Sequence, residues 1–231
     1  MLELLFSLNP GESFDIMRLV LLGAPGSGKG TEAKLICQKY GLPHISTGDI
    51  LRQALKDESP LGLEAKGFME RGELVPDHLI LNLIKERFLA ADAQKGFLLD
   101  GFPRTVAQAQ GLEDLLSQQG QKIDLACSLN VEREVLIKRL TARRICSGCG
   151  AIYNLLFQSP QKEGLCDKCG GKLEQRVDDQ RQTVENRLEV YLRQTQPLME
   201  YYDSRKLLKE VNGNAKPEEV FKDIDPLLQV L

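Results

Sequence analysis

A glycine-rich run near the start of the chain has the residue types and spacing to bind phosphate groups. It reads GAPGSGKGT over residues 23–31, with an apolar segment before it and a helical pattern after it. Glycines let the backbone turn so that several N–H groups point at one anion, and the following helix adds the positive end of its dipole. The lysine supplies a mobile charge for the outer phosphates. We therefore expect phosphate contacts from Gly26, Ser27, Gly28, Lys29, Gly30 and Thr31.

One position in this run departs from the general phosphate-loop pattern. That pattern places Ser or Thr directly after the lysine, as a magnesium ligand. Here Gly30 follows the lysine, and Thr31 comes one residue later. We therefore expect magnesium to be held mainly by the nucleotide's phosphates and by water.

Four cysteines form a second group with recognisable chemistry. Cys146 and Cys149 make one CxxC pair, and after sixteen residues Cys166 and Cys169 make another. This spacing predicts a four-thiolate zinc site, because each CxxC turn aims two sulfur atoms at one point. All four ligands are cysteine, so no position is open for a catalytic water, and the metal is expected to be structural. Disulfides, a redox pair and a nucleic-acid-binding zinc ribbon are the alternatives.

Length and composition bound the remaining possibilities. The chain has 231 residues and a net charge of −3, with 42% hydrophobic and 27% charged residues. This allows one sizeable core with small inserted lobes, and it gives no basic excess for nucleic acid as a main partner. We expect no membrane span, because no apolar run approaches about 18 residues. Residues 1–16 lack signal-peptide features, so we expect a cytoplasmic protein with a dispensable N-terminal extension; an ordered arm packed on the core is the alternative.

Short apolar runs alternate with helical patterns along the chain. The expected strands are residues 19–22, 44–45, 97–99, 125–129 and 208–211. The expected helices are residues 31–40, 49–56, 61–71, 77–91, 106–118, 131–142, a long helix over 179–202 that Pro197 kinks or divides, and 217–228. This alternation predicts an α/β fold in which helices cover both faces of a parallel sheet. Ligands bind beyond the carboxyl ends of such strands, so residues 31, 47–49 and 100–104 should meet in one cleft.

Six motifs in a fixed order resemble one family. They are GAPGSGKGT (23–31), ISTGDILR (45–52), RGELVPD (71–77), GFLLDGFPRT (96–105), ARR (142–144) and DDQxxTxxxRL (178–188). From residue 17 to the C-terminus they resemble adenylate kinases of the bacterial type with a long, zinc-bearing lid. Glycine at the position after the loop lysine is typical of that family.

The resemblance implies a three-layer P-loop fold with a five-stranded parallel sheet and two inserted lobes. Residues 17–45, 76–141 and 180–231 would form the core, residues 46–75 the lobe that binds the nucleoside monophosphate, and residues 142–179 the zinc-bearing lid. It also implies reversible transfer of a phosphoryl group from MgATP to AMP, giving two ADP, by a monomer that serves adenine nucleotide balance and purine salvage. A kinase with another base preference, or a nucleotide-binding zinc-ribbon module without turnover, is the alternative.

The resemblance further implies roles for charged residues. Arginines suit phosphoryl transfer because they stay charged and hold phosphate oxygens in bidentate pairs. Arg52 and Arg104 would hold the AMP phosphate, and Asp100 would orient the magnesium waters unless it only caps the turn after its strand. The implied catalytic set is Lys29, Asp100, Arg104, Arg143, Arg176 and Arg187.

Base recognition is expected from both sides of the cleft. Gln108 follows Arg104 by four residues, so it should project beside it and offer a donor and an acceptor to the adenine edge. The expected AMP contacts are Thr47, Arg52, Glu73, Leu74, Val75, Gly101, Phe102, Pro103, Arg104, Gln108, Arg176 and Arg187. The expected ATP contacts beyond the phosphate loop are Arg139, Arg143, Ile152, Tyr153 and Ala215.

Overall fold

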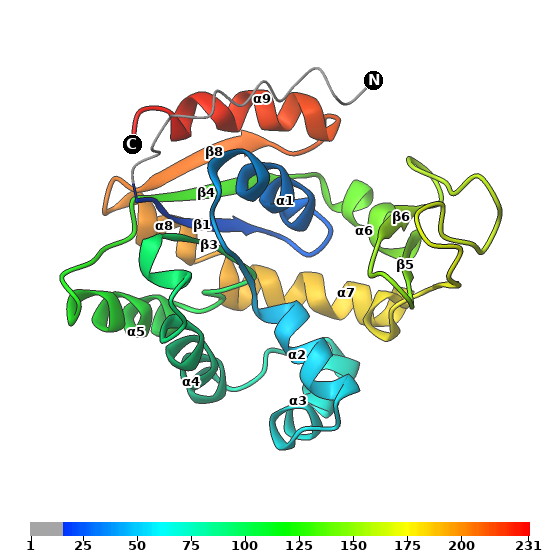
Figure 1. The fold of residues 1–231 in the computed structure, drawn as a ribbon, viewed down its shortest axis with the longest axis horizontal. Helices are drawn as coiled ribbons and strands as arrows, with labels where there is room; N and C mark the ends of the chain where they lie inside the picture. The colour runs from blue at the N-terminus through cyan, green and yellow to red at the C-terminus, as the bar shows by residue number, and fades with distance from the viewer. Residues whose placement is uncertain (1–15) are drawn as a thin grey trace.

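A five-stranded parallel sheet forms the centre of the molecule (Figure 1). The computed structural model describes residues 16–231, so the expected N-terminal extension lies, but for Ile16, outside the described residues. Across the sheet the order is β2-β3-β1-β4-β8. The strands are β1 (Arg18–Gly23), β2 (His44–Ser46), β3 (Phe97–Asp100), β4 (Leu125–Asn130) and β8 (Leu208–Asn212). The expected fold class and all five expected strands are confirmed. No strand end differs from the expected one by more than one residue.

The period of two along each strand divides the core into two layers. Leu19 and Leu21 of β1 lie on one face of the sheet, and α1 (Lys29–Tyr40) and α9 (Pro217–Leu228) cover this face. Val20 and Leu22 point to the opposite face. Because alternate side chains leave a strand on opposite sides, a strand buried on both faces must be apolar throughout, as β1 is.

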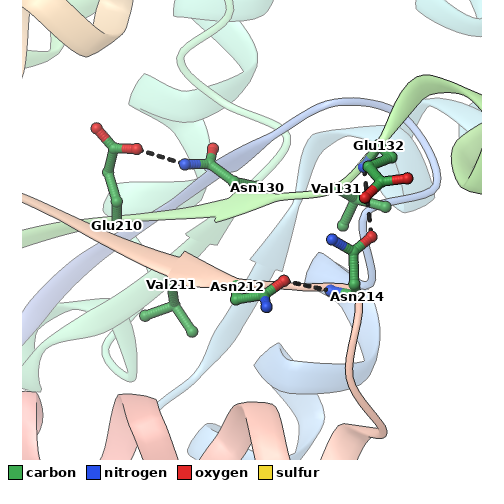
Figure 2. A pocket seen from close by; sticks show the side chains of 7 residues that line it. All are labelled: Asn130, Val131, Glu132, Glu210, Val211, Asn212 and Asn214. Atoms are coloured by element: carbon green, nitrogen blue, oxygen red, sulfur yellow. Dashed lines mark hydrogen bonds between the residues drawn. The ribbon is translucent and has the colours of Figure 1, made fainter.

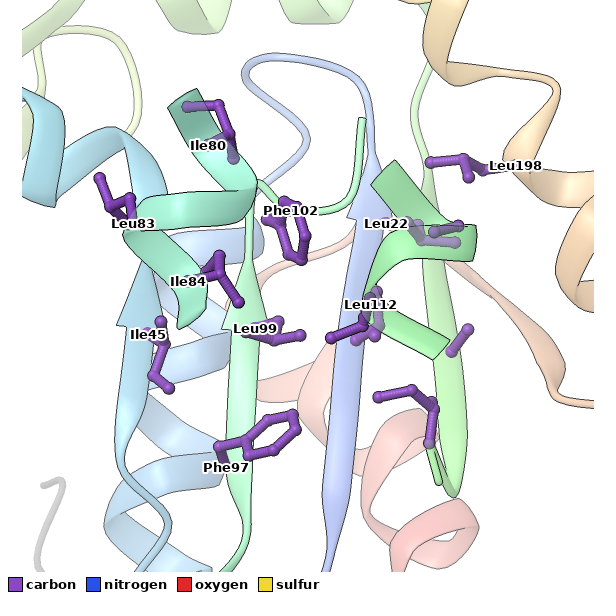
Figure 3. Close-up of a cluster of buried hydrophobic side chains, with 14 of the residues drawn as sticks. Leu22, Ile45, Ile80, Leu83, Ile84, Phe97, Leu99, Phe102, Leu112 and Leu198 are labelled. Atoms are coloured by element: carbon purple, nitrogen blue, oxygen red, sulfur yellow. The ribbon is translucent and has the colours of Figure 1, made fainter. Parts of the chain in front are cut away.

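The second face is covered by α4 (Asp77–Phe88), α5 (Val106–Ser117) and α8 (Leu198–Asp203). Figure 3 shows this layer, in which Leu22 and Leu99 of the sheet meet Ile84 of α4 and Leu112 of α5. Each of these side chains is at most 2% exposed. Burial of such a side chain contributes about 1.5–3 kcal/mol, so the layer holds the strand ends in place for the site.

A pair of helices, α2 (Thr47–Lys56) and α3 (Pro60–Arg71), projects from the sheet (Figure 1). Ser59 caps α3 by accepting a hydrogen bond from the Gly62 N–H at 3.2 Å. A Cβ atom on Gly62 would lie 2.2 Å from the Ala54 carbonyl oxygen. The close approach of these two helices therefore requires glycine at position 62.

A small antiparallel sheet lies between α6 (Arg133–Thr141) and α7 (Arg181–Val190). Its order is β6-β5-β7, with β5 (Arg143–Cys146), β6 (Ile152–Asn154) and β7 (Leu173–Glu174). A 3₁₀ turn, η3 (Val177–Asp179), returns the chain to α7. Four of the cysteines belong to this lobe: Cys146 ends β5, and Cys149, Cys166 and Cys169 lie in its loops. The small sheet lies apart from the main sheet (Figure 1).

The long helix expected over residues 179–202 is divided, as the proline predicts, but the division begins before Pro197. After α7 the chain forms a π-helical turn, η4 (Tyr191–Thr195), in which the Gln196 N–H donates to the Tyr191 carbonyl at 2.9 Å. Proline has no N–H to donate, and its ring clashes with the carbonyl four residues earlier. The wider turn displaces that carbonyl, and α8 then continues. No helix within residues 16–231 is both long and apolar enough to cross a membrane.

Candidate active site

The phosphate loop connects the end of β1 to the start of α1, as expected. Gly26 and Gly28 both have positive φ, 84° and 105°, and Gly28 is the N-cap residue of α1. A Cβ on Gly26 would lie 2.8 Å from the Leu140 Cγ atom, so only glycine fits there. The Lys29 ammonium folds back over the loop and donates to the carbonyls of Gly23 and Ala24 at 2.7 and 2.9 Å.

Asp100, at the end of β3, lies beside the loop. A Cβ on Gly30 would lie 3.4 Å from its Oδ2 atom, so the position that usually carries a hydroxyl is instead adjacent to a carboxylate. The same oxygen lies 3.3 Å from Nε2 of His44. His44 therefore restricts the orientation of the Asp100 carboxylate.

Cations gather in front of this loop. Burial lowers the pKa of Lys29 to about 8; attraction to Asp100 opposes the shift, and repulsion by Arg104, Arg187 and Arg143 adds to it. Groups that shift one another's pKa in this way share one low-dielectric space. The structure thus brings four of the expected cations together.

Arg52 and Arg176 belong to the same cluster. Burial, followed by repulsion from Arg187, lowers the pKa of Arg104 to about 10. Burial, followed by repulsion from Arg52, lowers the pKa of Arg176 to about 10, and the Nε atom of Arg176 is buried without a hydrogen-bond partner. A buried, unsatisfied cation is costly, so this arrangement favours an anionic ligand.

Two aspartates neutralise part of the cluster. Asp179 is fully buried and accepts two hydrogen bonds from Arg143, at 2.7 and 2.6 Å, and one from Arg187 at 3.2 Å. Asp178 pairs with Arg187 at 2.9 Å. Burial raises the pKa of Asp178, but the nearby arginines outweigh it and hold that pKa below its usual range. The carboxylates occupy guanidinium edges of the kind that phosphate oxygens also bind.

The expected monophosphate side is organised around Gly101, which follows β3. Its carbonyl accepts hydrogen bonds from the Thr47 hydroxyl and from Nε of Arg104, both at 2.8 Å. Arg52, on α2, pairs with Asp49 at 2.5 Å. Phe102 is fully buried and Pro103, joined to it by a cis peptide bond, is also buried, so these two residues support the turn with their side chains.

The segment after α3 contacts α7. A Cβ on Gly72 would lie 2.7 Å from the Arg187 side chain, so the two backbones approach closely there. Glu73 is exposed and pairs with Arg71 at 2.8 Å, Leu74 is half-buried, and Val75 is buried in the core. Backbone groups of this segment are therefore better placed for a ligand than the side chains of Glu73 or Val75.

Arg139 joins the phosphate loop to the loop after β8. Its guanidinium donates to the carbonyls of Gly213 at 2.9 Å and Asn214 at 3.3 Å, and more weakly to Ser27. Burial lowers the pKa of Arg139. Ala215 is partly buried against the layer under α1 and α9, so its backbone is the part available to a base.

A shallow cavity of about 500 Å³ adjoins this loop (Figure 2). It lies at the carboxyl ends of β4 and β8, where Asn214 accepts a hydrogen bond from the Glu132 N–H and donates its own N–H to Asn212. Asn130 donates to Glu210 across its rim. The lining has two carboxylates and no cation, which disfavours phosphate; the cationic cluster is the part of the cleft that suits it.

The four cysteine sulfurs form a compact group. All of them lie within 4.8 Å of one another, with 3.4 Å between Cys146 and Cys169 and 3.6 Å between Cys149 and Cys166. Tetrahedral zinc with Zn–S bonds of about 2.3 Å needs sulfurs about 3.8 Å apart, so the group fits a four-thiolate site. A disulfide requires about 2.05 Å, and all the cysteines are free.

Tyr153 is directed into this cysteine lobe and away from the cationic cluster. Its hydroxyl lies 3.5 Å from the Cys166 sulfur and accepts a hydrogen bond from the Asp167 N–H at 2.8 Å. Ile152, its neighbour, is 36% exposed. The structure therefore leaves Ile152 and the backbone of Tyr153 for contact with a ligand.

Fold and site together define a class. A glycine-rich loop between a parallel strand and a helix faces partly buried arginines from four other segments, which is the arrangement of a P-loop enzyme that transfers phosphoryl groups between nucleotides. A family model for adenylate kinase matches residues 21–207. The adenylate kinase of Geobacillus sp. (strain WCH70) is 54% identical over 92% of this chain and 98% of its own length. Those of Bacillus subtilis (strain 168) and Thermodesulfovibrio yellowstonii are 52% and 53% identical, again over 92% of this chain.

The chain belongs to the adenylate kinase family. It is a nucleoside monophosphate kinase, and the reaction of its family is reversible transfer of a phosphoryl group from ATP, used with Mg²⁺, to AMP. The comparisons give no support to a nucleotide-binding module without turnover.

Sequence reasoning missed three kinds of participant. Asp178 and Asp179 begin the sixth motif, but no function was predicted for them. Two adjacent acids in a chain with many arginines at motif positions are a signal for ion pairs. His44 was assigned only to a strand. Asp77 ends the third motif and begins an expected helix, but the sequence gives it no role, although it contacts Gln108.

Proposed function

We propose that this enzyme aligns MgATP and AMP end to end and neutralises their phosphates, including the transferring phosphoryl group, with Lys29 and five arginines. The observation that carries the proposal is that Lys29, Arg104, Arg176 and Arg187 are held with little solvent in one cleft: burial is the main cause that lowers the pKa of each, and repulsion by neighbouring arginines adds to it. Polyanionic substrates would remove this repulsion and supply the missing hydrogen-bond acceptors. Positioned cations of this kind are the main source of catalysis in phosphoryl transfer.

On the AMP side, Arg52 and Arg104 are proposed to hold the phosphate. Gly101 and Thr47 support Arg104, because its Nε atom and the Thr47 hydroxyl share the Gly101 carbonyl. Gln108 and the backbone over residues 73–75 would contact the base. AMP itself supplies the attacking oxygen, so no protein nucleophile is needed.

On the ATP side, the loop N–H groups and Lys29 are proposed to bind the phosphates. Lys29 would exchange the carbonyls of Gly23 and Ala24 for phosphate oxygens and follow the transferring group. Arg139, Ile152, the Tyr153 backbone and Ala215 would border the ATP base. Arg143 would hold the ATP phosphates, and Arg176 and Arg187 would contact the transferring group, once Asp178 and Asp179 share these arginines with phosphate.

Magnesium supplied with ATP would add charge neutralisation at the phosphates. Asp100 is the carboxylate placed to orient its water ligands, since it lies against Gly30 and Lys29. His44 contacts the Oδ2 atom of Asp100 and so limits the rotation of that carboxylate.

We propose that residues 46–75 and 142–179 act as two lobes on the core formed by residues 17–45, 76–141 and 180–231. Closure of the second lobe would exclude water from the site and so prevent the hydrolysis of ATP. Zinc held by Cys146, Cys149, Cys166 and Cys169 would keep that lobe rigid, with no part in the chemistry, because no ligand position is open. A monomer acting in the cytoplasm is proposed as well, and free cysteines agree with a reducing compartment.

A coupled assay of ADP formation from ATP and AMP tests the proposal. Lys29→Ala should lower turnover by at least about 100-fold, because it removes a cation aimed at the transferring group. Lys34→Ala, on an exposed position of the same helix, is the matched control and should stay within about two-fold of wild type. Wild-type turnover by the Lys29 variant would end the proposal.

A further inference from the structure

Gln108 is held in one orientation by two groups of opposite hydrogen-bonding character. Its Oε1 atom accepts a hydrogen bond from the Arg104 backbone N–H at 2.8 Å. Its Nε2 atom donates to Oδ1 of Asp77 at 2.7 Å. A backbone N–H can only donate and a carboxylate can only accept, so the two contacts agree on which end of the amide is oxygen.

Asp77 is itself fixed by a second contact. Its Oδ2 atom accepts a hydrogen bond from the Thr105 hydroxyl at 3.0 Å, and that hydroxyl in turn accepts one from the Gln108 backbone N–H at 3.1 Å. Asp77 lies at the first position of α4, whereas Gln108 and Thr105 belong to the start of α5. Gln108 is 1% exposed, so its amide cannot turn over without breaking both hydrogen bonds inside the protein.

The orientation determines what Gln108 can offer to a base. After these contacts the amide keeps one N–H and one oxygen lone pair. On the edge of adenine, N1 accepts a hydrogen bond and the N6 amino group donates one, which matches this pair. Hypoxanthine has the reverse pattern, because its N1 carries a proton and O6 accepts. A reversed amide would therefore favour hypoxanthine.

We propose that Asp77 is a positioning residue for adenine specificity: with the Arg104 N–H, it holds the Gln108 amide in the orientation that pairs with AMP. This inference rests on the proposed AMP site, in which Gln108 meets the base. Asp77 contacts no nucleotide itself and acts through Gln108.

The test compares AMP with inosine monophosphate as acceptor, at saturating MgATP, in the purified full chain. Asp77→Ala should lower kcat/KM for AMP at least ten-fold, mostly through KM, while kcat/KM for inosine monophosphate and KM for ATP change less than two-fold. The ratio of the two kcat/KM values therefore falls about ten-fold or more. A merely structural role would lower both values by the same factor and leave the ratio unchanged, and that result would overturn the proposal. Glu134→Ala, an exposed acid in the first turn of α6, is the matched control and should keep the wild-type ratio.

Asp77→Asn keeps the test decisive if the alanine variant does not fold. Asparagine retains one acceptor oxygen but places an N–H where the second oxygen was, so its ratio should lie between those of wild type and Asp77→Ala. A wild-type ratio in the folded Asp77 variants overturns the proposal.

Gln108→Met separates this failure from a failure of the proposed AMP site. If Gln108→Met keeps the wild-type ratio, Gln108 does not meet the base and the AMP site is wrong. If it loses the ratio while the Asp77 variants keep it, only the inference about Asp77 fails.

Discussion

Replacement of Asp179 by asparagine should destabilise the protein strongly. Asp179 is fully buried and accepts three hydrogen bonds from Arg143 and Arg187, whose side chains are 17% and 16% exposed. The variant removes the charge and turns an N–H toward a guanidinium. Loss of one partner of a buried ion pair costs about 3–5 kcal/mol; we take about 3 kcal/mol, because both arginines keep some contact with water. For a protein of this size that corresponds to a fall in Tm of roughly 6–12 °C.

A second ion pair, also with two hydrogen bonds between one guanidinium and one carboxylate, provides a control with different burial. Arg87 donates to both carboxylate oxygens of Asp92, at 2.8 and 2.5 Å, but the Asp92 side chain is 54% exposed. Exposed pairs contribute little, so Asp92→Asn should leave Tm close to wild type. Thermal unfolding of the nucleotide-free enzyme, followed by circular dichroism, measures both. Equal shifts in the two variants, or a change of less than about 2 °C for Asp179→Asn, would refute the reasoning that burial decides the contribution.

Two further predictions concern the metal and a buried acid. Removal of zinc with a chelator, or Cys149→Ser, should lower Tm while kcat at low temperature changes by less than about two-fold, because no ligand position is open for chemistry; unchanged Tm would count against a structural metal. Glu32 is 2% exposed with an unpaired Oε2 atom, and burial, followed by Glu218, raises its pKa from the ordinary 4.5 to about 8. The folded state therefore keeps a proton that the unfolded state releases, and this contribution to stability is lost as pH rises from about 4.5 to 8. The difference in Tm between Glu32→Gln and wild type should therefore be more favourable to the variant at pH 8.5 than at pH 5. The same difference at both pH values would contradict the assignment.

Much of the site could be predicted because its parts are local. The phosphate loop needs only glycines, a lysine and the flanking strand and helix, all within about fifteen residues. The CxxC pairs act in the same way, since each pair forms one turn. The alternation of apolar runs was enough for a parallel sheet with two covered faces.

The order of the strands and the break in the long helix were harder. Chain order does not show that β3 lies between β2 and β1, because that depends on which crossovers pack their helices best. Pro197 predicted a division, but the π-helical turn that begins at Tyr191 reflects how the carbonyls before a proline rearrange inside a packed protein.

The residue types, their spacing and the local turns, and through them the family and its phosphate chemistry, were therefore determined by the amino-acid sequence alone. Only the tertiary structure decided which charges and amides meet: Asp179 with Arg143, and Asp77 with Gln108, are pairs 36 and 31 residues apart in the chain. Such partners are chosen by the packing of separate helices and strands, since a hydrogen bond or ion pair contributes only when folding brings both groups together and excludes water from them.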